Sequence, residues 1–166
     1  MGCHTWFYKK IKGPTKAEAA AKVEEAFKKE VDFLQRLIDD RESFDQDLLE
    51  VYPEWTPEYA QEKIPFWTEH IAKIQSGFFT EDWIFERYLE LGLEIDSYEP
   101  GKGWYSSTDE LPHDLFRQGG YPDDTLHSLD ETLAYIKKNN CTTYEWTEKA
   151  LEEFWAKHPD GMINFG

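Results

Sequence analysis

The residues best suited to chemistry are concentrated between positions 104 and 124. His113 and Arg117 stand four residues apart, and Pro112 suits the first turn of a short helix that would place both side chains on one face. An imidazole beside a guanidinium can hold an anion, because arginine offers two parallel hydrogen bonds to a carboxylate or phosphate. The competing interpretation is a surface pair between Asp114 and Arg117, which contributes little to stability, next to a structural histidine.

Four aromatic residues accompany Arg117 in this segment, and three of them, Trp104, Tyr105 and Tyr121, are candidates for the walls of a site. Rings beside an arginine suit a nucleobase, because stacking contributes about 1–3 kcal/mol per base. A long irregular segment in a compact domain is usually functional or disordered, and the aromatic content of this one argues against disorder. The segment therefore predicts a binding site for a nucleotide-like ligand, formed by Arg117, His113, Trp104, Tyr105 and Tyr121.

Cys3 and His4 are a second pair of candidates, as ligands of a metal ion. Adjacent residues on a strand point to opposite faces of a sheet, so these two side chains make a poor joint chelate. No other pair of cysteines and histidines has the spacing of a zinc finger. We therefore predict no metal site and no cofactor.

The sequence contains no motif of a known catalytic centre. It has no glycine-rich phosphate loop, no nucleophile elbow and no His-Glu-x-x-His helix of a metalloprotease. His113, oriented by Asp114 or Asp124, could still act as a general base. A small phosphodiesterase-like or metal-dependent enzyme therefore stays open, but the sequence favours binding over catalysis.

Charge excludes some classes of partner. The net charge is −16, and residues 51–166, with 9 basic and 23 acidic side chains, carry −14 of it. Such a surface repels the phosphates of DNA and RNA, so we expect no direct nucleic-acid binding. No apolar run is long enough to span a membrane and no signal peptide follows Met1, so we expect a cytoplasmic protein without membrane contact.

Hydrophobic spacing and helix caps predict a mostly helical α+β protein. Strands near 4–10, 93–98 and 162–165 would form a small antiparallel sheet that joins the two chain ends and is covered by about five helices. Because no linker-like segment divides the chain, we predict a single domain over residues 1–166. The helices are expected to cover 16–41 or onward to 50, 58–75 with a kink or break at Pro65, 81–91, 129–138, and a last stretch to 157. Their expected N-caps are Thr15, Thr56 and Thr80, with capping boxes at Ser128 and Glu131 and at Thr142 and Glu145.

The opening Met-Gly-Cys-His-Thr-Trp-Phe-Tyr, together with Pro-His-Asp-Leu-Phe-Arg and Tyr-Pro-Asp-Asp, resembles a group of small uncharacterised proteins from bacteriophages and prophages. The resemblance implies a role in host takeover or counter-defence, inside the host cytoplasm. Proteins of that kind include sponges that sequester nucleotide immune signals, and acidic inhibitors that mimic nucleic acid.

The leading hypothesis is a non-enzymatic phage-type binding protein that sequesters a small nucleotide-derived immune signal and so inhibits host defence. The main alternative is an acidic mimic of nucleic acid that occupies a basic groove on a host protein. The sequence leaves open whether the chain forms a homo-oligomer or engages a host protein.

Overall fold

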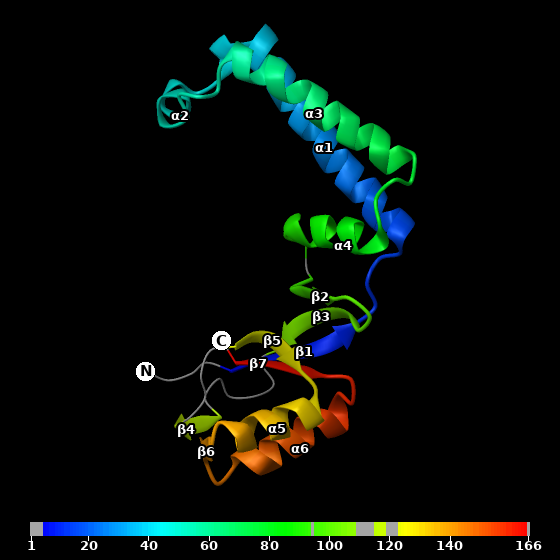
Figure 1. The fold of residues 1–166 in the computed structure, drawn as a ribbon. Coiled ribbons are helices and arrows are strands. Elements are labelled where there is room, and N and C mark those ends of the chain that lie inside the picture. The colour runs from blue at the N-terminus through cyan, green and yellow to red at the C-terminus, as the bar shows by residue number, and fades with distance from the viewer. Residues whose placement is uncertain (1–4, 94, 109–114, 119–122, 166) are drawn as a thin grey trace. The chain divides into compact units, whose positions relative to one another are not determined.

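The computed structural model describes residues 5–93, 95–108, 115–118 and 123–165, with only the backbone described at 116–118 and 123–124. Its contacts form two compact units (Figure 1). The sheet unit combines residues 1–13 with 94–166, and the helical unit is Pro14–Leu93. The prediction of a single domain stays a prediction.

The sheet unit is built on a five-stranded antiparallel sheet in the order β2-β3-β1-β7-β5. Strand β1 lies at its centre and pairs with β7, which confirms the prediction that the sheet joins the two ends of the chain. The fold class, α+β and mostly helical, is confirmed as well. The strands are β1 Thr5–Ile11, β2 Ser97–Glu99, β3 Gly103–Thr108, β5 Asp123–His127 and β7 Met162–Phe165.

Successive side chains on a strand point to opposite faces of the sheet, so neighbouring residues of β1 and β7 belong to two different apolar clusters. Phe7 of β1 stands opposite Ile163 of β7, and both belong to the main core of this unit. Helices α5 (Leu129–Lys138) and α6 (Thr147–Lys157) contribute to that core, α6 through Leu151, Phe154 and Trp155. The neighbouring positions, Tyr8 and Met162, belong to a smaller cluster with Tyr105 and Leu126.

The central segment is more regular than predicted, and this corrects the expectation of a long irregular stretch. Residues Gly103–Thr108 form β3, because Trp104 and Tyr105 pair with Ile11 and Lys10 of β1. Phe116–Gln118 form a short strand, β4, where we expected the end of a helix carrying His113 and Arg117. The partner of β4 is β6, Thr142–Thr143, whose β-branched residues favour an extended backbone.

Helix α6 begins later than predicted, so the capping box at Thr142 and Glu145 is wrong. The helix starts at Thr147, and the residue at its N-cap, Trp146, makes no side-chain capping bond. The buried Thr147 hydroxyl accepts from the Tyr144 backbone N–H at 3.0 Å and donates to the Leu115 carbonyl at 2.8 Å. The long-range bond to Leu115 is a tertiary contact, which local sequence cannot reveal.

The helical unit contains two long helices that run side by side, α1 (Lys16–Asp39) and α3 (Pro57–Gln75) (Figure 1). The predicted caps are confirmed: each threonine cap accepts a hydrogen bond from the backbone N–H three residues later. Helix α3 continues through Pro65 without a break. The other elements are the 3-10 turn Arg41–Ser43, α2 Gln46–Val51 and α4 Glu81–Glu90, and the caps are Thr15, Thr56 and Thr80.

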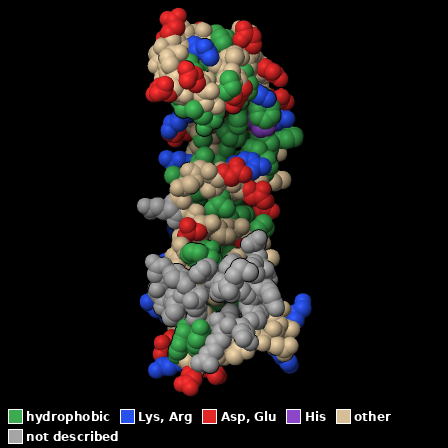
Figure 2. Space-filling view, turned by 90° about the vertical axis from the view of Figure 1, so that its left-hand side faces the viewer, with side chains coloured by type: hydrophobic (Ala, Val, Ile, Leu, Met, Phe, Trp, Pro, Cys, Tyr) green, Lys and Arg blue, Asp and Glu red, His purple; other side chains and the backbone are tan. Residues whose placement is uncertain are grey.

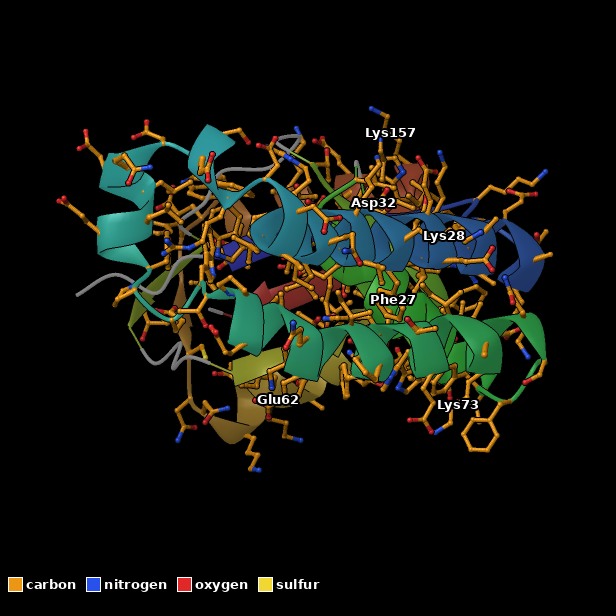
Figure 3. The ribbon with its side chains drawn as sticks, turned by 90° about the horizontal axis from the view of Figure 1, so that it is seen from above. Phe27, Lys28, Asp32, Glu62, Lys73 and Lys157 are labelled. Carbon is orange, nitrogen blue, oxygen red and sulfur yellow. The ribbon has the colours of Figure 1, made fainter. Side chains whose placement is uncertain are left out.

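Aromatic rings fill much of the space between these helices. Phe27 of α1 lies between α1 and α3 (Figure 3), with its ring 4.9 Å from that of Trp67. Phe79 stacks on Trp83 of α4 at 3.6 Å and 7°. Large rings bury much apolar area per residue, which explains how so polar a chain forms a core.

Candidate functional site

The structure describes three of the five predicted site residues, Trp104, Tyr105 and the backbone of Arg117. Trp104 and Tyr105 lie in β3 and are buried, whereas the backbone of Arg117 lies in β4. His113 and Tyr121 lie outside the described residues, so the predicted anion site of His113 and Arg117 stays a prediction. The described structure nevertheless places one predicted residue, Tyr105, in the lining of a polar pocket.

That pocket lies in the sheet unit and has a volume of about 290 Å³. Four separate segments form it: the end of β1, the β2–β3 hairpin with β3, the start of α5, and the turn from α6 into β7. Its volume is close to the lower end of ligand pockets, which run from about 300 to 1,000 Å³. The polar side chains of its lining are Lys10, Lys102, Tyr105, Ser128, Glu131 and Asp160.

Tyr105 is the most unusual group in the lining. Only 2% of its surface is exposed, and its ring packs with Leu126 and Met162. Its hydroxyl is the one polar atom of the side chain, and it forms no hydrogen bond with any residue that the structure describes. The buried polar atoms without a partner in the described residues belong to Thr5, Glu24 and Thr132 and not to Tyr105, so the Tyr105 hydroxyl is accessible and can bond to a polar ligand in the pocket that it lines.

The strand register positions a cation next to this hydroxyl. Lys10 of β1 is directly opposite Tyr105 of β3, and facing residues on paired strands point to the same side of a sheet. The stem of Lys10 also runs past Gly103, where an added Cβ would lie 3.0 Å from the lysine Cε. Within the described part of the chain, the Lys10 ammonium forms no ion pair, so it is available to an anion.

The rest of the lining is held by the start of α5. Ser128 and Glu131 form a reciprocal capping box, as predicted, with the Ser128 backbone N–H donating to Glu131 at 3.1 Å. Glu131 also pairs with Lys102 at 3.8 Å, and both side chains are more than 40% exposed, so the pair contributes little to stability. The partial positive charge at the N-terminus of α5 is offset by the carboxylates of Asp130 and Glu131 in its first turn.

Electrostatics keep Tyr105 in its neutral form. Burial raises the pKa of the Tyr105 hydroxyl above its ordinary value, and the negative charges of Asp160 and Glu99 raise it further. A phenol that stays protonated donates a hydrogen bond. The pocket therefore presents a donor, two ammonium groups and two carboxylates.

The raised pKa values predict a loss of stability in alkali. The pKa of Tyr8 is raised as well, by burial and then by Asp96. The unfolded chain releases phenolic protons at about pH 10, whereas the folded chain retains them, so the free energy of unfolding should fall as pH rises above that value. Urea denaturation at a series of pH values measures this fall. It should be shallower in the double variant Tyr8→Phe, Tyr105→Phe.

Met162→Leu, which alters the same cluster as Tyr105 without removing a phenol, is the control for this experiment and should leave the alkaline fall unchanged. An unchanged fall in the double variant would contradict the assignment to Tyr8 and Tyr105.

Sequence reasoning missed Lys10, Lys102 and Asp160. One available signal was Lys102, a cation between two glycines in the turn Gly101-Lys102-Gly103, where both glycines adopt positive φ. Lys10 gives no local signal, because its place beside Tyr105 depends on the pairing of strands far apart in the sequence.

No described group of three or more histidine, cysteine, aspartate or glutamate residues could hold a metal ion. Among the helices that the structure describes, none is long and apolar enough to cross a membrane. Carboxylates are widespread on the described surface, and Figure 2 shows a gathering of them at the end of the helical unit that carries α2. Residues 39–58 in that region contain eight acidic side chains and one arginine.

Comparison with protein-family models, with curated proteins and with solved structures finds no match to this chain.

Proposed function

We propose that this protein binds a small nucleotide-like anion in the polar pocket of the sheet unit and releases it chemically unchanged. The observation that carries the proposal is Tyr105, whose hydroxyl forms no hydrogen bond with the described residues and which lies opposite Lys10, a cation that forms no ion pair in the same ranges. In the setting that the phage resemblance implies, the ligand is an immune signal of the bacterial host. The protein would then act as a sponge in the host cytoplasm.

The chemistry of the lining supports a ligand with both a phosphate and hydrogen-bond donors. Lys10 attracts a phosphate. Asp160 and Glu131 accept hydrogen bonds from sugar hydroxyls or from the amino group of a base. The same carboxylates repel an anion that has no donors of its own, such as inorganic phosphate.

The lining also favours binding over turnover. Its described side chains include no imidazole and no thiol, and the carboxylates of Glu131 and Asp160 are the groups of the described lining that could act as a general base. The neutral phenol of Tyr105 donates a hydrogen bond but does not accept a proton at neutral pH.

The test begins with thermal denaturation of the full chain in the presence of mononucleotides and cyclic dinucleotides. One of them should raise the melting temperature, and heating the complex should release that compound intact. Lys10→Met and Tyr105→Phe should each weaken binding about tenfold, since hydrogen bonds to charged groups contribute about 1.5–3 kcal/mol. Lys9→Met, on the opposite face of β1, is the matched control and should bind normally.

Three results would redirect the proposal. Recovery of a degraded product would indicate an enzyme. If no nucleotide raises the melting temperature, nucleotides are excluded as the ligand. Loss of binding in Arg117→Ala but not in Lys10→Met would move the site to the predicted cluster of His113 and Arg117.

The second candidate function is the acidic inhibitor that binds a basic groove on a host protein. It is supported by the carboxylates around α2, where Leu48, Val51 and Tyr52 are also exposed (40%, 67% and 39%). It predicts salt-sensitive association with a basic protein that Lys10→Met leaves unchanged.

A further inference from the structure

Helices α5 and α6 border an apolar groove of about 510 Å³ in the sheet unit, separate from the lining of the polar pocket. The α5 side includes Leu133, and α6 contributes a run of side chains along one face. These α6 residues are Leu151, Trp155 and Ala156, with Glu148 and Glu152 alongside them.

The floor of this groove is apolar and rigid. Leu151 and Trp155 are only 5% and 6% exposed and belong to the main core. The Trp155 indole N–H donates to the Gly161 carbonyl at 3.1 Å, so the polar edge of the ring is already satisfied. Leu133, in contrast, is 51% exposed, which leaves a large apolar side chain in water beside the groove.

The rim of the groove is negatively charged. Glu148 and Glu152 lie one helical turn apart on α6, and neither forms an ion pair within the described ranges. Like charges at this spacing repel each other and destabilise a helix. The neighbouring face of the same helix is neutralised, since Lys149 pairs with Glu153 at 3.8 Å.

We propose that this groove binds an amphipathic helix of a partner protein that carries lysine or arginine one turn apart. Its apolar side chains would cover Leu133 and enter the groove, which is the usual mode of helix-in-groove recognition. Its cations would pair with Glu148 and Glu152 and remove their mutual repulsion. A second copy of this chain is a poor occupant, because two molecules of charge −16 repel each other.

This inference is independent of the polar pocket, so it stands or fails separately from the proposed ligand. The probe is a fluorescently labelled peptide of leucine and lysine at helical spacing, titrated with the full chain while anisotropy is recorded. Leu133→Ser and the double variant Glu148→Gln, Glu152→Gln should each weaken binding about tenfold. Glu153→Gln, on the same helix but outside the groove, is the matched control and should bind like the parent.

Several outcomes would overturn the proposal. One is a shuffled peptide of the same composition, which has no apolar face, binding as tightly as the leucine and lysine peptide. A peptide with glutamate in place of lysine that binds as tightly would overturn the proposal in the same way. Another is a dimer in sedimentation that Leu133→Ser dissociates, since a second copy would then be the occupant. A third is binding to phosphatidylcholine vesicles that Leu133→Ser abolishes, since a lipid surface would then be the occupant. Circular dichroism of each variant establishes that it keeps its helices.

Discussion

Replacing Phe154 by alanine is expected to lower the free energy of unfolding by about 3–5 kcal/mol. Phe154 is 3% exposed and lies at the centre of the main core of the sheet unit. Its ring centroid is 5.3 Å from that of Phe7 and 5.4 Å from that of Trp155. Truncation would therefore remove the contact of Phe154 with Phe7 on the central strand and leave a cavity. Urea denaturation followed by circular dichroism measures the decrease in the free energy of unfolding.

Glu153→Ala provides the matched control, because the Glu153 side chain is 68% exposed on the same helix. Its effect should stay within about 0.5 kcal/mol. A similar midpoint for Phe154→Ala and Glu153→Ala would contradict the place of Phe154 in the core.

The second large effect is expected from Gly13→Ala, a substitution of one methyl group. An added Cβ at Gly13 would fall inside the indole of Trp104. That indole is 6% exposed and packs against Tyr98 with 4.7 Å between ring centroids, so it has little room to move. Overpacking of this kind costs about 1–3 kcal/mol, and we expect a value near the upper end in urea denaturation.

A double-mutant cycle identifies the cause of this loss. In a Trp104→Ala background the obstacle is gone, so Gly13→Ala should then cost little. Equal losses in the two backgrounds would mean that Trp104 is not the obstacle. The cycle also bears on the interpretation of Trp104 as a wall of a ligand site, because a ring that packs on Gly13 has a structural role of its own.

The parts of the fold that depend on local sequence were predictable. Thr15, Thr80 and Ser128 cap helices because a hydroxyl accepts the backbone N–H three residues on, and that geometry needs no distant partner. The box at Thr142 failed for the opposite reason. Thr142 pairs with a strand more than twenty residues earlier in the chain, and the hydroxyl of Thr147 bonds to Leu115.

The candidate site was predictable only in part. Tyr105 was expected to bind a ligand because of its neighbours in sequence, whereas the structure brings it beside Lys10 through strand pairing. The neighbouring His113 and aromatic rings directed attention to Arg117, yet the cations of the described pocket are lysines from a strand end and a hairpin turn. Single-sequence reasoning finds clusters that are close in the chain and misses those formed by register.

The pairing of β1 with β7 has a consequence for biosynthesis. The helical unit is one continuous segment, so it can fold as soon as that segment leaves the ribosome. Strand β1 emerges before it, but both central pairings of β1 use strands translated later, β3 and then β7. Lys9 and Lys10 on β1 would discourage wrong pairing during this delay, since lysine on an open strand edge opposes aggregation. The sheet is thus the late step of folding on the ribosome.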